Sequence, residues 1–195
     1  LEIANYANTK FFINIDSFFN NPSYSYSYLS SYTLSKRQTL DWIKILMNKY
    51  TIKIINMKIY HMFGENDSPT KFVPFLVSKL KANQSSLDMT PGNQTRDFIY
   101  IEDVVDAFEY VINLLENLDQ FQEFELGTGI SHSIKEFALL VKNITNSKTK
   151  LNFGSIPYRK GEIMVSKIEN FTLKNLGWKP SFTLKEALTK YISSV

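Results

Sequence analysis

Three side chains near the start of the chain have types and spacing that could move a proton. Tyr32 and Lys36 stand four residues apart, and Ser17 closes an apolar run upstream of them. On a helix, positions i and i+4 share a face, so the phenol and the ammonium would point the same way. A free phenol titrates near ~10, and a nearby ammonium favours the phenolate, which makes a tyrosine a usable acid or base near neutral pH. A serine hydroxyl close by could hydrogen-bond the same substrate oxygen as charge develops on it.

The spacing alone does not identify a site, because Tyr6 and Lys10 show it too. That pair precedes an apolar strand expected over 11–15 and has no serine upstream, so we expect it at a helix end. The alternative for Tyr32 and Lys36 is a surface tyrosine with a solvated lysine one turn on.

The elements that would position these residues follow from the apolar periodicity. Four apolar residues recur at helical spacing and predict a helix over 32–49: Leu40, Ile43, Leu46 and Met47. The run 11–15 reads as a buried parallel strand. Further strands are expected at 52–59, 87–89, 98–101 and 123–126, and further helices at 72–81, 102–116, 133–143, 171–176 and 184–192. Ser131 or Ser133 is a plausible N-cap for the helix 133–143, with Glu136 in its first turn.

One long segment resembles a known family signature. Residues 92–107 read GNQTRDFIYIEDVVDA. This resembles the G-x-x-x-R-D-F-I-Y-V-x-D-V-V-x-A signature of the extended short-chain dehydrogenases, the NAD-dependent epimerase/dehydratase family. Three more segments resemble that family in the same order: IINMKIYHMFG at 54–64, FELGTG at 124–129 and LGWKP at 176–180. The resemblance covers essentially the whole chain.

Within the family, four short segments are most similar to the CDP-abequose and CDP-paratose synthases, which reduce CDP-4-keto-3,6-dideoxy sugars. They are NIDS at 14–17, YTLSK at 32–36, HMFG at 61–64 and KFVP at 71–74. Two positions depart from the usual family residues: Phe63 replaces a tyrosine and Glu65 replaces a proline. The family's 4,6-dehydratases carry an Asp-Glu pair directly after the catalytic hydroxyl residue, where this chain has Phe18 and Phe19. The resemblance therefore implies a reductase or an epimerase, not a dehydratase.

The resemblance implies an α/β fold, consisting of the C-terminal part of a Rossmann-type parallel sheet plus a small α/β substrate-binding domain. Residues 1–60 would be the remnant of the dinucleotide-binding domain, and residues 61–195 mainly the substrate-binding domain, interwoven with it. The implied activity is an NAD(P)-dependent oxidoreductase or epimerase acting on a nucleotide-activated keto-sugar, specifically a 4-keto-deoxyhexose reductase that makes surface-polysaccharide (O-antigen) precursors.

The resemblance also assigns roles to residues. The catalytic residues would be Ser17, Tyr32 and Lys36, and the cofactor-binding residues Tyr32, Lys36 and His61. The substrate-binding residues would be His61, Lys71, Phe72, Arg96 and Arg159. Arginine suits the diphosphate of a sugar nucleotide because its guanidinium can bind it through two bonds. The alternative for each arginine is a solvated surface residue, and the alternative for His61 is a structural role.

Three other features have simpler readings. Asp97 and Asp103 look like paired carboxylates, but we expect Asp97 to orient Arg96 and Asp103 to cap a helix that begins near Val104. Trp178 reads as a packing residue. Residues 20–31 are rich in Ser, Tyr and Asn, and we expect a substrate-side loop there rather than a disordered surface loop.

The family's glycine-rich cofactor loop is missing from this sequence. None of the seven glycines forms the G-x-x-G-x-x-G turn that holds the cofactor pyrophosphate. The chain also starts with Leu1, in what resembles the fourth helix of a Rossmann domain (1–8). We therefore expect a C-terminal fragment whose cofactor, NAD or NADP, belongs to the intact parent. The alternative is an inactive remnant, or a fragment that binds a sugar nucleotide or a partner without catalysis.

The composition excludes several other classes of protein. A net charge of +3, spread along the chain, gives no nucleic-acid patch. Zero cysteines and two histidines leave no metal-ligand cluster, and the absence of cysteine fits a cytoplasmic protein. No apolar run approaches the ~20 residues of a membrane span. We expect a nucleotide-sugar as the main partner and a second copy of the parent, in a homodimer, as the other.

Overall fold

The computed structural model describes residues 1–21, 29–168 and 172–195, which divide into two compact units. Unit 1 comprises Leu1–Tyr60, Val105–Leu126 and Ile168–Lys179, and unit 2 comprises His61–Val104, Gly127–Lys167 and Pro180–Val195. The chain first passes from unit 1 to unit 2 after Tyr60, and it then returns twice to unit 1. Positions 22–28 of the expected substrate-side loop lie outside the described residues.

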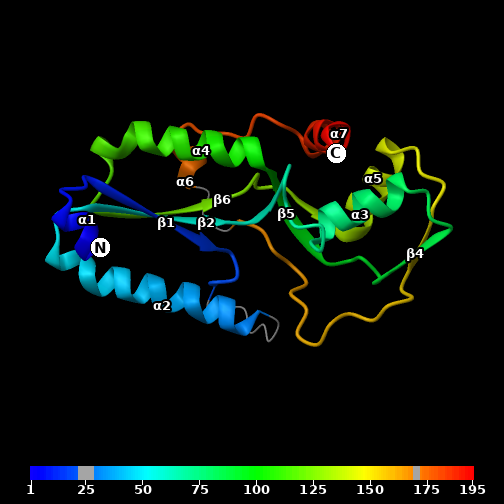
Figure 1. The fold of residues 1–195 in the computed structure, drawn as a ribbon, viewed down its shortest axis with the longest axis horizontal. Coiled ribbons are helices and arrows are strands. Elements are labelled where there is room, and N and C mark those ends of the chain that lie inside the picture. The colour runs from blue at the N-terminus through cyan, green and yellow to red at the C-terminus, as the bar shows by residue number, and fades with distance from the viewer. Residues whose placement is uncertain (22–28, 169–171) are drawn as a thin grey trace. The chain divides into compact units, whose positions relative to one another are not determined.

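Unit 1 is built on a parallel sheet, as predicted. Its strands are β1 (Phe11–Ser17), β2 (Lys53–Ile59) and β6 (Phe121–Leu126), in the order β1-β2-β6. Adjacent parallel strands need a crossover connection, and the helix α2 (Ser30–Leu46) supplies it between β1 and β2. Figure 1 shows α2 along one face of this sheet and α4 (Ile101–Leu114), which belongs to unit 1 from Val105 onward, along the other.

The predicted helix over 32–49 is confirmed with shifted ends. Helix α2 begins two residues earlier, and a short 3-10 turn, η1 (Met47–Lys49), follows it. Its buried residues Leu40 and Ile43 face the sheet, and Ile43 packs with Ile54 of β2 in one apolar cluster. Strand β1 runs two residues past its predicted end because Asp16 and Ser17 continue the pairing with β2.

The remaining elements of unit 1 are α1 (Glu2–Tyr6), η2 (Leu115–Asn117) and α6 (Thr172–Asn175). The segment after α6 is fastened to α4 by two hydrogen bonds. Trp178, which is buried, donates from its indole nitrogen to Asp106 Oδ2 at 2.8 Å, and Tyr110 donates to the carbonyl oxygen of Leu176 at 2.5 Å. These contacts confirm that Trp178 is a packing residue.

Unit 2 contains a mixed sheet and a separate strand pair. Strands β3 (His61–Phe63), β5 (Thr95–Tyr100) and β7 (Ser131–Ser133) form a sheet in the order β3-β5-β7, where β3 pairs parallel and β7 antiparallel to β5. Strands β4 (Ser86–Met89) and β8 (Lys150–Phe153) pair with each other. The strands β3, β7 and β8, of three or four residues each, were not predicted.

Three helices enclose the core of unit 2. They are α3 (Phe72–Lys81), α5 (Ile134–Ile144) and α7 (Leu184–Ser194). Each buries its apolar stripe in one cluster, whose fully buried members include Leu76, Leu80, Phe137, Val141 and Leu188. The helix predicted over 133–143 is confirmed, with Ser133 as its N-cap.

Two acidic residues of unit 2 have structural partners. The prediction that Asp103 caps a helix near Val104 is wrong, because α4 already begins at Ile101 and Asp103 Oδ1 accepts from the amide of Ser181 at 2.7 Å. Glu65 accepts from the Tyr100 hydroxyl at 2.8 Å and from Ser194 Oγ at 2.9 Å. Burial raises the pKa of Tyr100 above its ordinary value, so its hydroxyl stays protonated and able to donate.

Candidate active site

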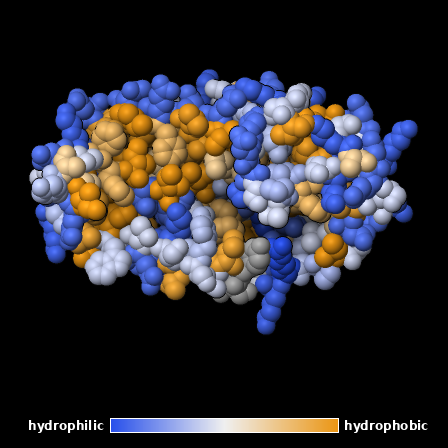
Figure 2. Space-filling model, viewed as in Figure 1, coloured by the Kyte–Doolittle hydropathy of each residue, from blue (hydrophilic) through white to orange (hydrophobic). Residues whose placement is uncertain are grey.

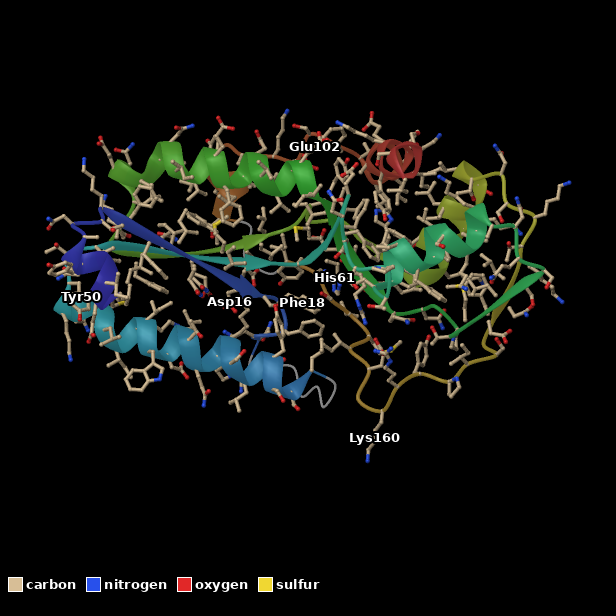
Figure 3. The ribbon with its side chains drawn as sticks, in the orientation of Figure 1. Asp16, Phe18, Tyr50, His61, Glu102 and Lys160 are labelled. Atoms are coloured by element: carbon tan, nitrogen blue, oxygen red, sulfur yellow. The ribbon has the colours of Figure 1, made fainter. Side chains whose placement is uncertain are left out.

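Ser17 lies at the carboxyl end of β1, in unit 1, and is buried. The chain turns immediately after it. The amide of Phe18 donates to the carbonyl oxygen of Ile59 at 3.1 Å, and the amide of Asn20 donates to the carbonyl oxygen of Ser17 at 2.8 Å. The Ser17 hydroxyl accepts from the amide of Phe19 at 3.4 Å, and a hydroxyl that accepts one bond can still donate its own proton. Figure 3 labels Asp16 and Phe18, on either side of Ser17.

Tyr32 and Lys36 lie in the first two turns of α2, also in unit 1. Lys36 Nζ lies 5.7 Å from the centroid of the Tyr32 ring, which confirms that the two side chains share a face. The same ammonium donates to the carbonyl oxygen of Ile15 at 2.6 Å. The Tyr32 side chain remains 42% exposed. Lys36 therefore connects the tyrosine to the strand that ends at Ser17.

The second pair with this spacing has a different geometry. Tyr6 is the last residue of α1, and the chain leaves the helix through Ala7 and Asn8, whose φ is 54°. Lys10 lies beyond that turn, so the two residues do not share a helix face. Tyr6 is 90% exposed. Tyr6 and Lys10 thus have the same spacing without the same arrangement.

Two of the expected substrate residues of unit 2 are held by neighbouring chain segments. Arg96, on β5, forms an ion pair with Glu162 and donates to the carbonyl oxygen of Ile163 at 2.6 Å. His61, on β3, lies 3.1 Å from Ser166 Oγ through its Nε2. Burial lowers the pKa of His61 well below its ordinary value, and the positive charge of Arg96 acts in the same direction. His61 is therefore neutral near pH 7 and can contribute a hydrogen bond, not a charge.

The other three expected substrate residues of unit 2 lie on or near its surface. Arg159 is exposed, and its carbonyl oxygen accepts a hydrogen bond from the amide of Glu162 at 3.1 Å. Lys71, at the N-cap of α3, pairs with Asp67 at 2.7 Å and keeps 58% of its side chain exposed. The ring of Phe72 is partly buried, with its centroid 5.7 Å from that of Phe137.

The prediction that Asp97 orients Arg96 is wrong. Neighbouring residues of a strand point to opposite faces, and the Asp97 carboxylate instead accepts from the amides of Thr128 and Gly129 at 2.9 and 2.8 Å. Burial raises the pKa of Asp97, although these bonds and one from the Thr128 hydroxyl act in the opposite direction. Asp97 therefore fixes the turn that follows β6.

Sequence reasoning missed a group of polar residues around Ser17. Asn14 and Asp16 on β1 and Asn56 on β2 are all buried, and Asn56 is hydrogen-bonded to each of the other two. The signal was present in the sequence, because two polar residues at a spacing of two interrupt the apolar run of residues 11–17 on one face of the strand.

Among residues 1–21, 29–168 and 172–195, no three His, Asp or Glu side chains are grouped so that they could hold a metal ion. Over the same ranges, the helices are all too short or too polar to cross a membrane.

Comparison with known proteins gives consistent matches. Residues 12–127 match the family described as "NAD dependent epimerase/dehydratase family". The chain is 36% identical over 194 residues to a CDP-abequose synthase of Salmonella muenchen, covering 99% of this chain and 66% of the relative. It is 27% identical over 168 residues to a putative UDP-glucose 4-epimerase of Methanocaldococcus jannaschii, covering 85% of this chain and 53% of that relative. The chain thus spans just under two thirds, or less, of the length of these curated relatives.

Solved structures share the fold. A GDP-mannoheptose C4 reductase from Campylobacter jejuni with NADP bound aligns with a TM-score of 0.82 at 19% identity, covering 98% of this chain and 69% of that one. A UDP-glucose 4-epimerase from Thermotoga maritima with UDP-glucose aligns with a TM-score of 0.81 at 20% identity, covering 98% and 65%.

Proposed function

Because the chain belongs to the NAD dependent epimerase/dehydratase family, we propose that it contributes the catalytic residues for NAD(P)-dependent reduction of a nucleotide-activated 4-keto sugar. The observation that carries the proposal is the position of Lys36. Its ammonium bonds the carbonyl oxygen of Ile15, on the strand that ends at Ser17, and lies beside the ring of Tyr32. A proton donor, a cation and a hydroxyl are thus supplied by one strand end and one helix.

Each of the three residues has one role in the proposed reaction. The nicotinamide, when bound, supplies the hydride that reaches the carbonyl carbon. Tyr32 gives its phenolic proton to the carbonyl oxygen, so that the ketone becomes an alcohol. The positive charge of Lys36 stabilises the phenolate that forms when Tyr32 loses its proton. Ser17 donates a hydrogen bond to the substrate carbonyl oxygen as negative charge develops on it.

The residues of this chain fit one part of the cofactor. The exposed phenol of Tyr32 and the ammonium of Lys36 suit the nicotinamide and its ribose. The seven glycines of the sequence provide no G-x-x-G-x-x-G turn for the pyrophosphate. The proposal therefore concerns the catalytic side of the cofactor, and cofactor affinity is the first quantity to measure.

The substrate class is proposed from the relatives and from unit 2. Similarity to CDP-abequose synthases favours a CDP-linked 4-keto-deoxyhexose, used in surface-polysaccharide precursors. Phe18 follows Ser17 and packs against Tyr60 with ring centroids 5.7 Å apart, so this position offers an apolar contact instead of an acid for eliminating water. We assign binding of the sugar-nucleotide diphosphate to Arg159, assisted by Arg96 and His61. We assign contacts with the nucleotide to Lys71 and Phe72.

The test is a titration followed by turnover. NADPH and NADH are added separately to the purified chain while nicotinamide fluorescence is recorded. A CDP-4-keto-3,6-dideoxy sugar is then added, and oxidation of the nicotinamide is followed by absorbance. Tyr32→Phe is expected to lower turnover by roughly 10²–10⁴-fold, the usual contribution of a general acid, and to change cofactor affinity by a much smaller factor.

The chain offers a matched control in Tyr6→Phe, which removes the same hydroxyl from the pair with the same spacing and should leave turnover unchanged. Equal turnover by Tyr32→Phe and the unsubstituted chain would refute the assignment. Saturable sugar-nucleotide binding without turnover would instead favour a binding protein without catalysis.

A further inference from the structure

A row of polar side chains, buried on β1 and β2 and partly exposed on β6, crosses the sheet of unit 1 at a position where parallel sheets are normally apolar. Asn14, Asn56 and Glu123 stand opposite one another on β1, β2 and β6. Asn56 is fully buried, Asn14 is 9% exposed and Asp16, one step further along β1, is 2% exposed. Buried polar groups destabilise a fold unless they are hydrogen-bonded, so a connected network of them needs a specific reason.

The Asp16 carboxylate collects four hydrogen bonds, all from N–H donors. Oδ1 accepts from the amide of Ser17 at 2.8 Å and from Asn20 Nδ2 at 3.3 Å. Oδ2 accepts from Asn20 Nδ2 at 3.0 Å and from Asn56 Nδ2 at 3.1 Å. One carboxylate therefore bonds both the first and the last residue of the turn 17–20, and Figure 3 shows it at the end of β1.

Asn56 attaches this carboxylate to the middle strand. Its amide nitrogen donates to Asp16 and also to Glu123 Oε2 at 2.7 Å, and its Oδ1 accepts from Asn14 Nδ2 at 2.6 Å. Glu123 in turn pairs with Lys58 at 3.2 Å. Asn56 thus uses its amide nitrogen and oxygen to hold Asp16 in place relative to β2 and β6.

We propose that Asp16 is a positioning residue: it fixes the turn 17–20 and thereby the direction of the Ser17 hydroxyl. The catalytic part of this inference rests on the role proposed above for Ser17. Three backbone amides of the turn also donate hydrogen bonds: Phe18 to the carbonyl oxygen of Ile59, Asn20 to the carbonyl oxygen of Ser17, and Phe19 to the Ser17 hydroxyl. Asp16 adds a bond at each end, so its carboxylate holds Ser17 and Asn20 together.

The test compares Asp16→Asn with Glu123→Gln. The first keeps the volume of Asp16 but turns one of its acceptor atoms into a donor that faces other donors. The second changes the Glu123 carboxylate, which also accepts a hydrogen bond from Asn56. This carboxylate makes no described contact with residues 17–20. Amide hydrogen exchange of Phe18 and Asn20 is measured by NMR, together with the thermal midpoint. We expect exchange at these two amides to rise at least tenfold in Asp16→Asn and to stay within twofold in Glu123→Gln.

A rescue variant and turnover measurements distinguish a positioning role of Asp16 from a general contribution to stability. The double variant Asp16→Asn/Asn20→Asp restores a carboxylate–amide bond across the turn and should recover most of the lost protection. In the turnover assay, Asp16→Asn should lower kcat roughly as much as Ser17→Ala and leave KM within twofold. Unchanged exchange in Asp16→Asn, loss of protection over the whole sheet, or normal kcat with a loosened turn would each overturn the proposal. If the unsubstituted chain shows no turnover, the proposed function fails, while the exchange and rescue data still decide whether Asp16 holds the turn.

Discussion

At the scale of single residues, the two Tyr-x-x-x-Lys pairs show what spacing can and cannot predict. Tyr32 and Lys36 share a helix face because α2 continues past both, whereas α1 ends at Tyr6. The i,i+4 rule holds only where the helix includes both positions. The bond from Lys36 to the Ile15 carbonyl could not be predicted, because it joins residues 21 positions apart through the tertiary fold.

His61 gives a prediction about stability and pH. Burial and the charge of Arg96 lower its pKa in the folded chain, so between that pKa and the ordinary value near ~6.5 the unfolded chain binds more protons. The free energy of unfolding should therefore be highest above about pH 6.5 and fall as the pH is lowered, by at most ~1.4 kcal/mol per pH unit from this group. Urea unfolding at several pH values between about 5 and 7.5 measures it.

The substitution that tests this is His61→Asn, which should flatten the dependence between pH 6.5 and 5 relative to the unsubstituted chain. His132→Asn removes the other histidine and keeps His61, so it should retain the slope. A slope that survives in His61→Asn would assign the pH dependence to another group.

At the scale of elements, the periodic helices and the strands β1, β2, β4, β5 and β6 were predictable, whereas β3, β7 and β8 were not. The helix 72–81 agrees with α3 at both ends, and Ser133 caps α5, as its sequence predicts. The prediction that Asp103 caps a helix is wrong because α4 starts earlier. The Asp103 carboxylate instead accepts a hydrogen bond from the amide of Ser181, 78 residues away in sequence. Local rules therefore located the elements, while the partners of buried polar groups depended on the tertiary structure.

The cap of α5 supports a quantitative prediction. The Ser133 hydroxyl accepts from the amide of Glu136 at 3.1 Å, and the Glu136 carboxylate accepts from the amide of Ser133 at 2.9 Å. Ser133→Ala should lower the free energy of unfolding by about 1 kcal/mol in urea titrations at pH 7. Ser155→Ala, at an exposed serine outside the helices, should change it by less than ~0.5 kcal/mol.

The same cap has a pH dependence of defined sign. The bonds from the backbone and side chain of Ser133 lower the pKa of Glu136 in the folded chain. Its contribution is therefore present above the ordinary glutamate value near ~4.3 and is lost as the pH falls through the folded pKa. The difference between the unsubstituted chain and Ser133→Ala should shrink at low pH, and a constant difference would contradict a charged capping box.

At the scale of the whole molecule, the candidate residues divide between the two units. Ser17, Tyr32 and Lys36 belong to unit 1, and His61 and Arg159 belong to unit 2. Substitutions can therefore be made in one unit at a time, and their effects on cofactor binding and on sugar-nucleotide binding can be compared. The family was recognisable from residues 92–107 alone, but the network at Asp16 was not, because side chains on three strands build it.

Unit 1 also has an open sheet edge. Within the described ranges, β1 pairs only with β2, so its outer edge carries backbone groups that another strand could bind. Ile15 on β1 is 53% exposed, and Val105 and Ile112 on α4 are 59% and 44% exposed. Figure 2 shows apolar side chains gathered on this face of unit 1, over α4 and the neighbouring sheet. An open edge beside an apolar surface favours association with a second copy of the chain.

We therefore expect this chain to self-associate as its concentration rises, and sedimentation velocity measures the extent. Ile15→Glu places a charge on the surface beside the open edge and should weaken association by roughly tenfold, equal to about 1.4 kcal/mol. Leu34→Glu is the matched control, because Leu34 is also 53% exposed in unit 1 but lies on α2 and not on the edge strand, and it should leave association unchanged. Equal effects of the two substitutions would mean that general surface hydrophobicity drives association, and a monomer at every concentration would mean that the edge of β1 does not bind a second copy.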